Sequence, residues 1–333
     1  MDNSRSNSFL RSREGVLTVV ALAVLLAAPL VAQAAGQTYF ISLASRVAIL
    51  ALAGVGLNLA LGSGGMISFG HAAFFGLGGY VAGAMVFHAQ EGGQFLGLLA
   101  GTQQALLSWP LALAVAGIAA LFIGVISLRT SGVYFIMITL AFAQMFYYLA
   151  LSFPTYGGED GMTLYERSTL GGLSVSGDLP FFFVCFGVLL LALLLCSRLT
   201  GSRFGAALMT ARQNETRLAT VGINPFPVKL TGFVISAMIT ALAGVLLVEQ
   251  NGFASPSLLS WHRSGEIMIF VILGGVGRLI GPVLGAAVFI LLETVIGGYT
   301  DRWQLVLGLV LLGIVLFARG GLVGLLAGRA RHD

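Results

Sequence analysis

The stretch that decides the fold is LGSGGMISFGHAAFFGLGGYVAG, residues 61–83, where glycines stand among large apolar side chains around Ser68 and His71. Glycine is unfavourable inside a helix in water. Three explanations are therefore open for this stretch: a lid or phosphate loop, a Ser/His catalytic site, or a helix break inside a membrane. The composition of the whole chain decides between them.

The composition excludes a soluble domain. The 333 residues are 57% hydrophobic and 9% charged, with a mean hydropathy of +0.96, whereas soluble domains carry roughly 25% charged residues. Apolar runs such as VALAVLLAAPLVA (20–32) do not alternate with polar residues as the strands of a transmembrane barrel do. The sequence therefore predicts an all-α polytopic integral membrane protein.

About ten transmembrane helices are expected, because ten apolar segments are long enough to cross hydrocarbon. They are residues 16–35, 39–61, 70–90, 108–128, 133–153, 180–198, 229–249, 264–280, 282–298 and 303–318. The first holds Ala32-Gln33-Ala34, a pattern also found at signal-peptidase sites. Its length and the spans that follow directly favour a retained helix.

The positive-inside rule orients this scheme. With both termini in the cytoplasm, thirteen of the seventeen basic residues fall on the inner side. The outer side receives the other four, Arg46, Arg167, Arg263 and Arg302. We therefore expect one transmembrane domain over 1–333, with cytoplasmic tails at 1–14 and 319–333 and a cytoplasmic loop at 199–228.

The glycines of residues 61–83 predict two different local structures. Three glycines in the four positions 62–65 predict a helix break over 62–68, and such a break is tolerated only inside protein or beside a watery cavity. From there on, small residues recur on one helical face and predict close helix packing. They are Ala72, Gly76, Gly79 and Gly83.

Ser68 and His71 lie three residues apart and could share a helical face. One interpretation is a Ser/His intramembrane hydrolase, although no nucleophile motif surrounds Ser68. A second makes His71 an interhelical hydrogen-bonding group, and a third places it on the substrate path. We favour the second and expect no catalytic role.

The loop at 199–228 predicts one surface helix over 202–221, with Ser202 as N-cap and Gly222 as its end. It could rest on lipid headgroups or dock a cytoplasmic partner that supplies energy. No P-loop motif occurs in the chain, so ATP is not hydrolysed here by that device.

Six segments carry a family resemblance, and they occur in this order: GLNLALGSGGMISFGHAAFFGLGGYVAG (56–83), SLRTSGVYFIMITLAFAQMF (127–146), GGEDGM (157–162), SRFGAALMTARQNETRLATVGINPFPVKL (202–230), GFASPSLLSWHRSGEIMIFVILGGVGRLIGPVLGA (252–286) and WQLVLGLVLLGIVLFARGGLVGLL (303–326). They resemble the LivM-type permeases of branched-chain amino acid ABC importers. The resemblance covers nearly the whole chain from about residue 40.

The resemblance implies a non-catalytic translocation subunit in a bacterial cytoplasmic (inner) membrane. It would work with a second homologous permease, two cytoplasmic ATPase subunits that bind ATP and Mg²⁺, and a periplasmic substrate-binding protein. No cofactor, metal or nucleic acid is expected on this chain. The candidate substrate-path residues are Ser63, Gly64, Gly65, Ser68, His71, Gly158 and Gly161. The candidate ATPase-docking residues are Ala211, Arg212, Asn214, Glu215 and Gly222.

The solute and the role of the outer charges stay open at this point. Relatives with these motifs also carry urea or short amides, and an ion-coupled secondary transporter is a further alternative. Intramembrane charges are costly and tend to pair or face cavities. Arg46, Glu249, Glu266 and Glu293 are therefore expected to form a structural ion pair, or to line a vestibule or a contact with the binding protein.

Overall fold

Long apolar helices dominate the computed structural model, which describes residues 13–95, 99–165, 167–170, 173–174, 177–300, 302–317 and 320–327. Seven helices in these ranges are long and apolar enough to cross a membrane. They are α2 (Arg13–Ala34), α3 (Thr38–Asn58), α4 (His71–Glu91), α5 (Ala105–Ser127), α6 (Val133–Leu151), α7 (Asp178–Thr200) and α10 (Pro225–Asn251). The expected all-α membrane class is confirmed.

Three of the ten expected spans are shorter helices: α11 (Trp261–Gly274), α12 (Gly281–Gly297) and α13 (Trp303–Phe317). The expected bounds 264–280 were wrong, because α11 ends at Gly274 and a turn follows. Gly275 and Gly277 have φ of +121° and +80°, values that only glycine adopts readily. Ten crossings therefore remain a prediction.

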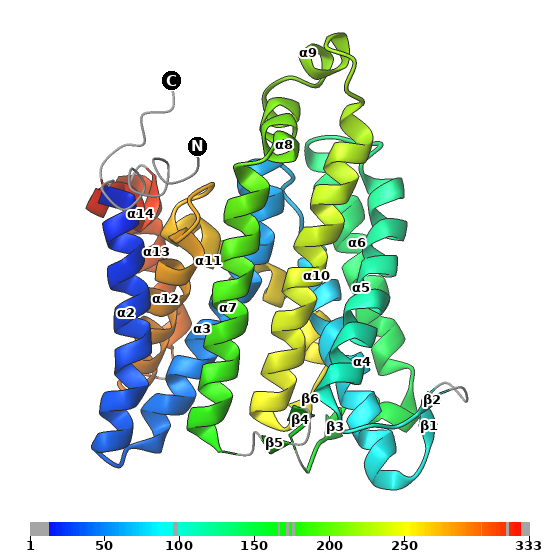
Figure 1. Ribbon diagram of the computed structural model, residues 1–333, viewed down its shortest axis with the longest axis vertical. Coiled ribbons are helices and arrows are strands. Elements are labelled where there is room, and N and C mark those ends of the chain that lie inside the picture. The colour runs from blue at the N-terminus through cyan, green and yellow to red at the C-terminus, as the bar shows by residue number, and fades with distance from the viewer. Residues whose placement is uncertain are drawn as a thin grey trace.

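The helices run between two ends of the molecule that differ in structure (Figure 1). One end, called here the α8 end, carries α8 (Arg203–Gln213), α9 (Glu215–Thr220), the start of α2, and α14 (Gly321–Ala327). The other, called the strand end, carries three two-stranded antiparallel pairs. These are β1 (Gln94–Phe95) with β2 (Leu99–Ala100), β3 (Met162–Thr163) with β6 (Phe253–Ala254), and β4 (Thr169–Leu170) with β5 (Leu173–Ser174).

Helices α4 and α10 cross at backbone contact distance. A Cβ on Gly78 would lie 2.2 Å from the Ala241 carbonyl oxygen, and one on Gly244 would lie 1.8 Å from the Phe75 oxygen. Neither position has room for a larger residue. The expected small-residue face packs closely too, with Gly76 against Leu259 and Gly79 against Val248.

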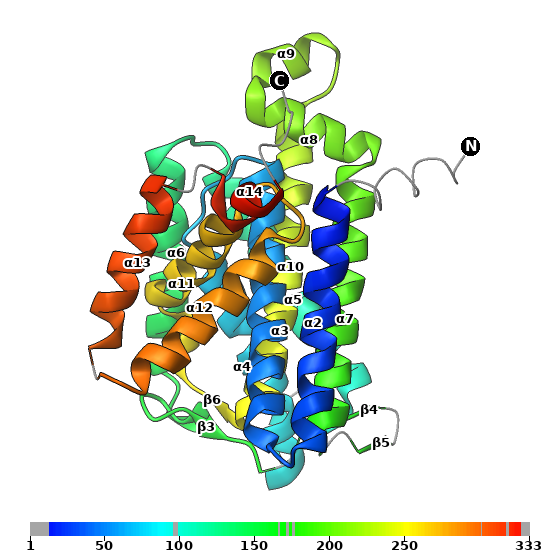
Figure 2. The same cartoon turned by 90° about the vertical axis from the view of Figure 1, so that its left-hand side faces the viewer.

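After α10 the chain turns back into the bundle instead of leaving it. A Cβ on Gly83 of α4 would lie 3.5 Å from the Cβ of Ala254, Gly76 faces Leu259, and Ser264 Oγ accepts a 2.9 Å hydrogen bond from Ala72 N. The segment after α10 therefore runs back along α4 and includes the short helix η3 (Pro256–Leu259). It continues as α11, which pairs with α12 in a hairpin whose turn lies near α14 (Figure 2).

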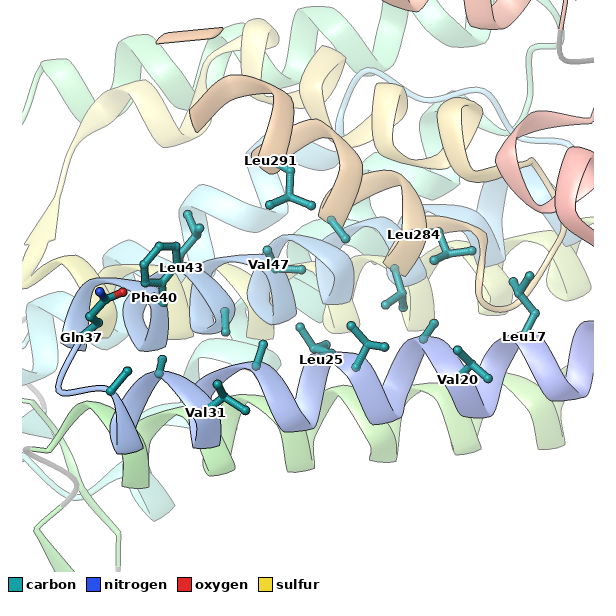
Figure 3. Close-up of a pocket in the computed structure, with 18 of the residues that line it drawn as sticks. Leu17, Val20, Leu25, Val31, Gln37, Phe40, Leu43, Val47, Leu284 and Leu291 are labelled. Atoms are coloured by element: carbon teal, nitrogen blue, oxygen red, sulfur yellow. The ribbon is translucent and has the colours of Figure 1, made fainter. Parts of the chain in front are cut away.

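A groove of about 550 Å³ runs along α2, with α3 and α12 as its other walls (Figure 3). Gln37 is the one polar side chain in the lining that the structure describes. The labelled leucines and valines point into it from all three helices. Its surface matches lipid hydrocarbon and offers nothing to a polar solute.

The two expected tails differ from the structure in part. Helix α2 already begins at Arg13, and residues 1–12 lie outside the described residues. Within the expected tail 319–333, α14 is a helix whose Val323 is fully buried. Arg278, in the α11–α12 turn, donates hydrogen bonds to Glu14 of α2 and to the Val323 carbonyl oxygen. Both chain ends that the structure describes are thereby held against the hairpin.

Candidate translocation and coupling site

The expected helix break is present at the α8 end. Helix α3 continues as a π-helical turn, η1 (Leu59–Ser63), after which residues 64–70 are not helical and α4 begins at His71. Gly65 has φ of +67°. Of the candidate path residues here, Ser63 is half-buried, Gly64 is buried and Gly65 is exposed.

A neighbouring turn requires the glycine at position 62, in η1 just before the break. A Cβ on Gly62 would lie 2.6 Å from the Cα of Gly277. Asn58 joins the same two segments, because its Oδ1 accepts from Gly277 N and its Nδ2 donates to the Arg278 carbonyl, both at 2.9 Å. The break and the α11–α12 turn therefore form one unit.

Ser68 and His71 are fully buried but are not hydrogen-bonded to each other. Ser68 Oγ accepts from Gly70 N at 3.1 Å. His71 Nε2 lies 2.8 Å from Ser236 Oγ, whose hydroxyl donates to the Gly56 carbonyl at 2.6 Å. Since that hydroxyl proton is in use, Nε2 must donate to Ser236.

The resulting chain of bonds joins α4, α10 and α3, which is the interhelical role we favoured for His71. The ring's Nδ1 has no hydrogen-bond partner among the described residues. Because the histidine does not contact Ser68, the pair lacks the nucleophile–base contact that hydrolysis requires. Its place on a substrate path stays a prediction.

The expected single helix over 202–221 was wrong, because it is split at Asn214. Ser202 caps α8 as expected, with its Oγ accepting from Gly205 N. Asn214 then takes extended backbone angles and caps α9 by accepting from Arg217 N at 3.0 Å. An asparagine that bonds to local backbone competes with helix continuation, which explains the split.

Arg212 connects α8 to the break. Its Nη1 donates to the Gly62 carbonyl oxygen. Its aliphatic part covers Gly65, where a Cβ would lie 2.6 Å from Arg212 Cγ. The docking candidate and the path candidates are thus in direct contact, although they are about 150 residues apart in the sequence.

The other docking candidates occupy distinct environments. Ala211 is buried, whereas Asn214, Glu215 and Gly222 are exposed. Glu215 forms an ion pair with Lys229 of α10. Sequence reasoning missed the apolar part of this surface, where Val221 is 75% and Ile223 40% exposed. Two exposed β-branched residues beside the glycine were the available signal.

Gly158 and Gly161 lie at the strand end, away from the break. Both have positive φ, +50° and +76°. A Cβ on Gly161 would lie 2.5 Å from the Ala254 carbonyl oxygen. These glycines shape the turn that leads into β3, and the structure does not bring them together with residues 63–71.

Two of the three outer glutamates form ion pairs, as one of the two open interpretations expected. Arg46 bonds Glu293 at 3.0 Å and Arg263 bonds Glu266 at 2.6 Å. Glu249 is 6% exposed and accepts a 2.9 Å hydrogen bond from Trp109 Nε1. Among the described residues, no group of three or more His, Cys, Asp or Glu side chains could hold a metal ion.

Known proteins resemble this chain over most of its length. The family described as branched-chain amino acid transport system / permease component matches residues 39–318. The high-affinity branched-chain amino acid transport system permease protein LivM of Salmonella typhimurium is 26% identical over 307 residues, covering 85% of this chain and 69% of that protein. LivM of Escherichia coli is 27% identical over the same lengths. No solved structure matches the chain.

Proposed function

The chain belongs to the branched-chain amino acid transport permease family, and on that premise we propose that it is the translocating subunit of an ABC importer for branched-chain amino acids. It would sit in a bacterial cytoplasmic membrane and have no catalytic activity of its own. The seven long apolar helices support this assignment, and so do the names of the two LivM relatives.

The importer would contain several further subunits. A second permease would complete the pathway, two cytoplasmic ATPase subunits would bind ATP and Mg²⁺, and a periplasmic protein would deliver the solute. The relatives are named as parts of a transport system. The exposed α8–α9 surface, with its two apolar side chains and its basic residues, offers a docking place for the ATPase.

The contact between Arg212 and the Gly62 carbonyl carries the mechanism. An ATPase that moves α8 would pull on η1 through this bond. Because Asn58 holds the break to the α11–α12 turn, the turn would move with it. ATP-driven closure would in this way shift the pathway between outward and inward access. The α8 end then faces the cytoplasm and the strand end the periplasm.

The test is uptake of labelled leucine into proteoliposomes that hold the complete transporter. Arg212→Ala is expected to lower leucine uptake per ATP hydrolysed at least tenfold, because the link to the break is lost. Arg198→Ala is the matched control, since it removes an exposed arginine from the last turn of α7, outside α8 and α9. It should stay within twofold of wild type.

Three outcomes contradict parts of the proposal. Uptake that persists after substitution of the ATPase's Walker lysine would refute ATP coupling. Equal uptake by the two arginine variants would refute the route through Arg212. Uptake of urea or propionamide, without uptake of leucine, would refute a branched-chain amino acid as the solute.

A further inference from the structure

A polar cavity of about 390 Å³ lies between α3, α10 and the start of α11. Two arginines line it, Arg46 from α3 and Arg263 from α11. No carboxylate belongs to its described lining. The cavity falls within the size range of small-molecule sites, roughly 300–1,000 Å³, and both charged side chains in its described lining are cationic.

Both arginines are partly buried in the helical part of the chain. Arg46 is eight residues into α3, about 12 Å from the helix start at 1.5 Å per residue. The Arg263 guanidinium stands over the Phe75 ring, 5.8 Å from its centroid. Charges at such depth are costly and mark cavities and solute pathways.

Each arginine keeps donors for a further ligand. Arg46 holds Glu293 with Nη2, and Arg263 holds Glu266 with Nη1. A guanidinium has five N–H donors in a planar fork that fits a carboxylate. One nitrogen of each fork is used in these pairs, so the remaining donors are available to an anion.

The same cavity offers an acceptor that the protein leaves unused. Gln250 donates from Nε2 to the Ser42 carbonyl at 2.7 Å. Its Oε1 is buried and has no hydrogen-bond partner among the described residues. Leu50 and Leu247 complete the wall. Anion donors, an acceptor for an ammonium group and an apolar wall thus meet in one cavity.

We propose that this cavity binds the transported amino acid as a zwitterion on its way from the strand end toward the break. Arg46 and Arg263 bind its carboxylate, Gln250 Oε1 accepts from its ammonium group, and the leucines contact its side chain. This assignment rests on the proposed function, because it takes the solute to be an α-amino acid.

The experiment uses the complete transporter in proteoliposomes. Ser42→Cys, with Cys185→Ser and Cys196→Ser, places a single thiol of this chain in the cavity lining. Its modification by an anionic and a cationic methanethiosulfonate reagent is timed. We expect the anionic reagent to be favoured at least tenfold relative to a Thr155→Cys control at the exposed turn after α6. L-Leucine should slow modification at least threefold, and leucinamide, which lacks the carboxylate, should not.

Arg263→Gln combined with Glu266→Gln removes one of the two cations and leaves no unpaired glutamate. This double variant should lose both the anion preference and the protection by leucine. Arg263→Lys should keep the preference, and Arg302→Gln, an exposed arginine at the same end, should change neither. Uptake of leucine by the wild-type transporter is measured alongside.

The outcomes separate the two proposals. If wild type takes up leucine but leucine protects no better than leucinamide, the carboxylate site is wrong and the proposed function stands. If leucine protects Ser42→Cys but is not taken up, the proposed function fails and the site stands. An anion preference that survives in the double variant overturns the role of Arg263.

Discussion

Two hollows of different chemistry lie on adjacent faces of α3. Phe40, Ala44 and Val47 face the apolar groove beneath α2, whereas Tyr39, Ser42 and Arg46 face the polar cavity beside α10 and α11. Each residue of the first set follows one of the second by one or two positions, and each position turns the side chain by about 100° around the helix. One helix thus separates a lipid-like environment from a watery one.

The two hollows also differ in which part of the chain builds them. The cavity is lined entirely by residues within the family match at 39–318. The groove needs α2, which lies outside that match. The difference teaches that the cavity belongs to the part of the fold shared with the family, while the groove depends on an element outside the match.

An aspartate placed in each of the two hollows should reveal the largest difference between them. Ala28→Asp puts a carboxylate in the groove wall, about two-thirds of the way along α2. Its insertion should cost up to about 2.5–3.5 kcal/mol, the range for a charge at a helix centre, and most of the protein should disappear from the membrane fraction. Ser42→Asp in the polar cavity should leave the yield within twofold. Quantitative immunoblots measure both, with Ala28→Leu as control, and equal yields for the two aspartates would contradict the distinction.

Breaking the ion pair at the cavity should have an intermediate effect. Arg46→Leu and Glu293→Leu each leave one charge unpaired, whereas the double variant leaves none. The side chains are 41% and 21% exposed, so the coupling energy should be modest, about 1 kcal/mol. Thermal unfolding of the four proteins in detergent gives this value. Strictly additive losses would show that the pair contributes no coupling.

Shortening one exposed apolar side chain of the groove should have the smallest effect on stability. Val31 lines it and is 68% exposed. Val31→Ala should change the unfolding free energy by less than about 0.5 kcal/mol, because lipid tails are as apolar as the lost methyl groups. Val47 lines the same groove but is 6% exposed, so Val47→Ala should cost more. Thermal unfolding of both variants decides the order, and a larger loss for Val31→Ala would indicate a bound partner instead of lipid.

Local features of the fold were predictable from the sequence. The break, expected at 62–68 and found at 64–70, the small-residue face of α4 and the Ser202 cap all follow from backbone preferences of neighbouring residues. The split at Asn214 was missed because asparagine is tolerated in a helix and is also a good cap. Only the packing around the loop selects between these two states.

The candidate site was less predictable because it joins distant segments. Arg212 meets Gly62 across 150 residues, and Arg46 chooses Glu293 over the other two expected glutamates across 247 residues. No spacing rule connects such positions. The sequence pointed to Arg46 as a costly charge, but the cavity that joins it to Gln250 and Arg263 exists only in the folded chain.

The bonds of Arg278 have a consequence for the order of assembly during synthesis. Glu14 is made 264 residues before its partner arginine. Val323, the third member, comes later still. These hydrogen bonds can form only after most of the described chain has been made, so they join α2 to the α11–α12 turn late in synthesis.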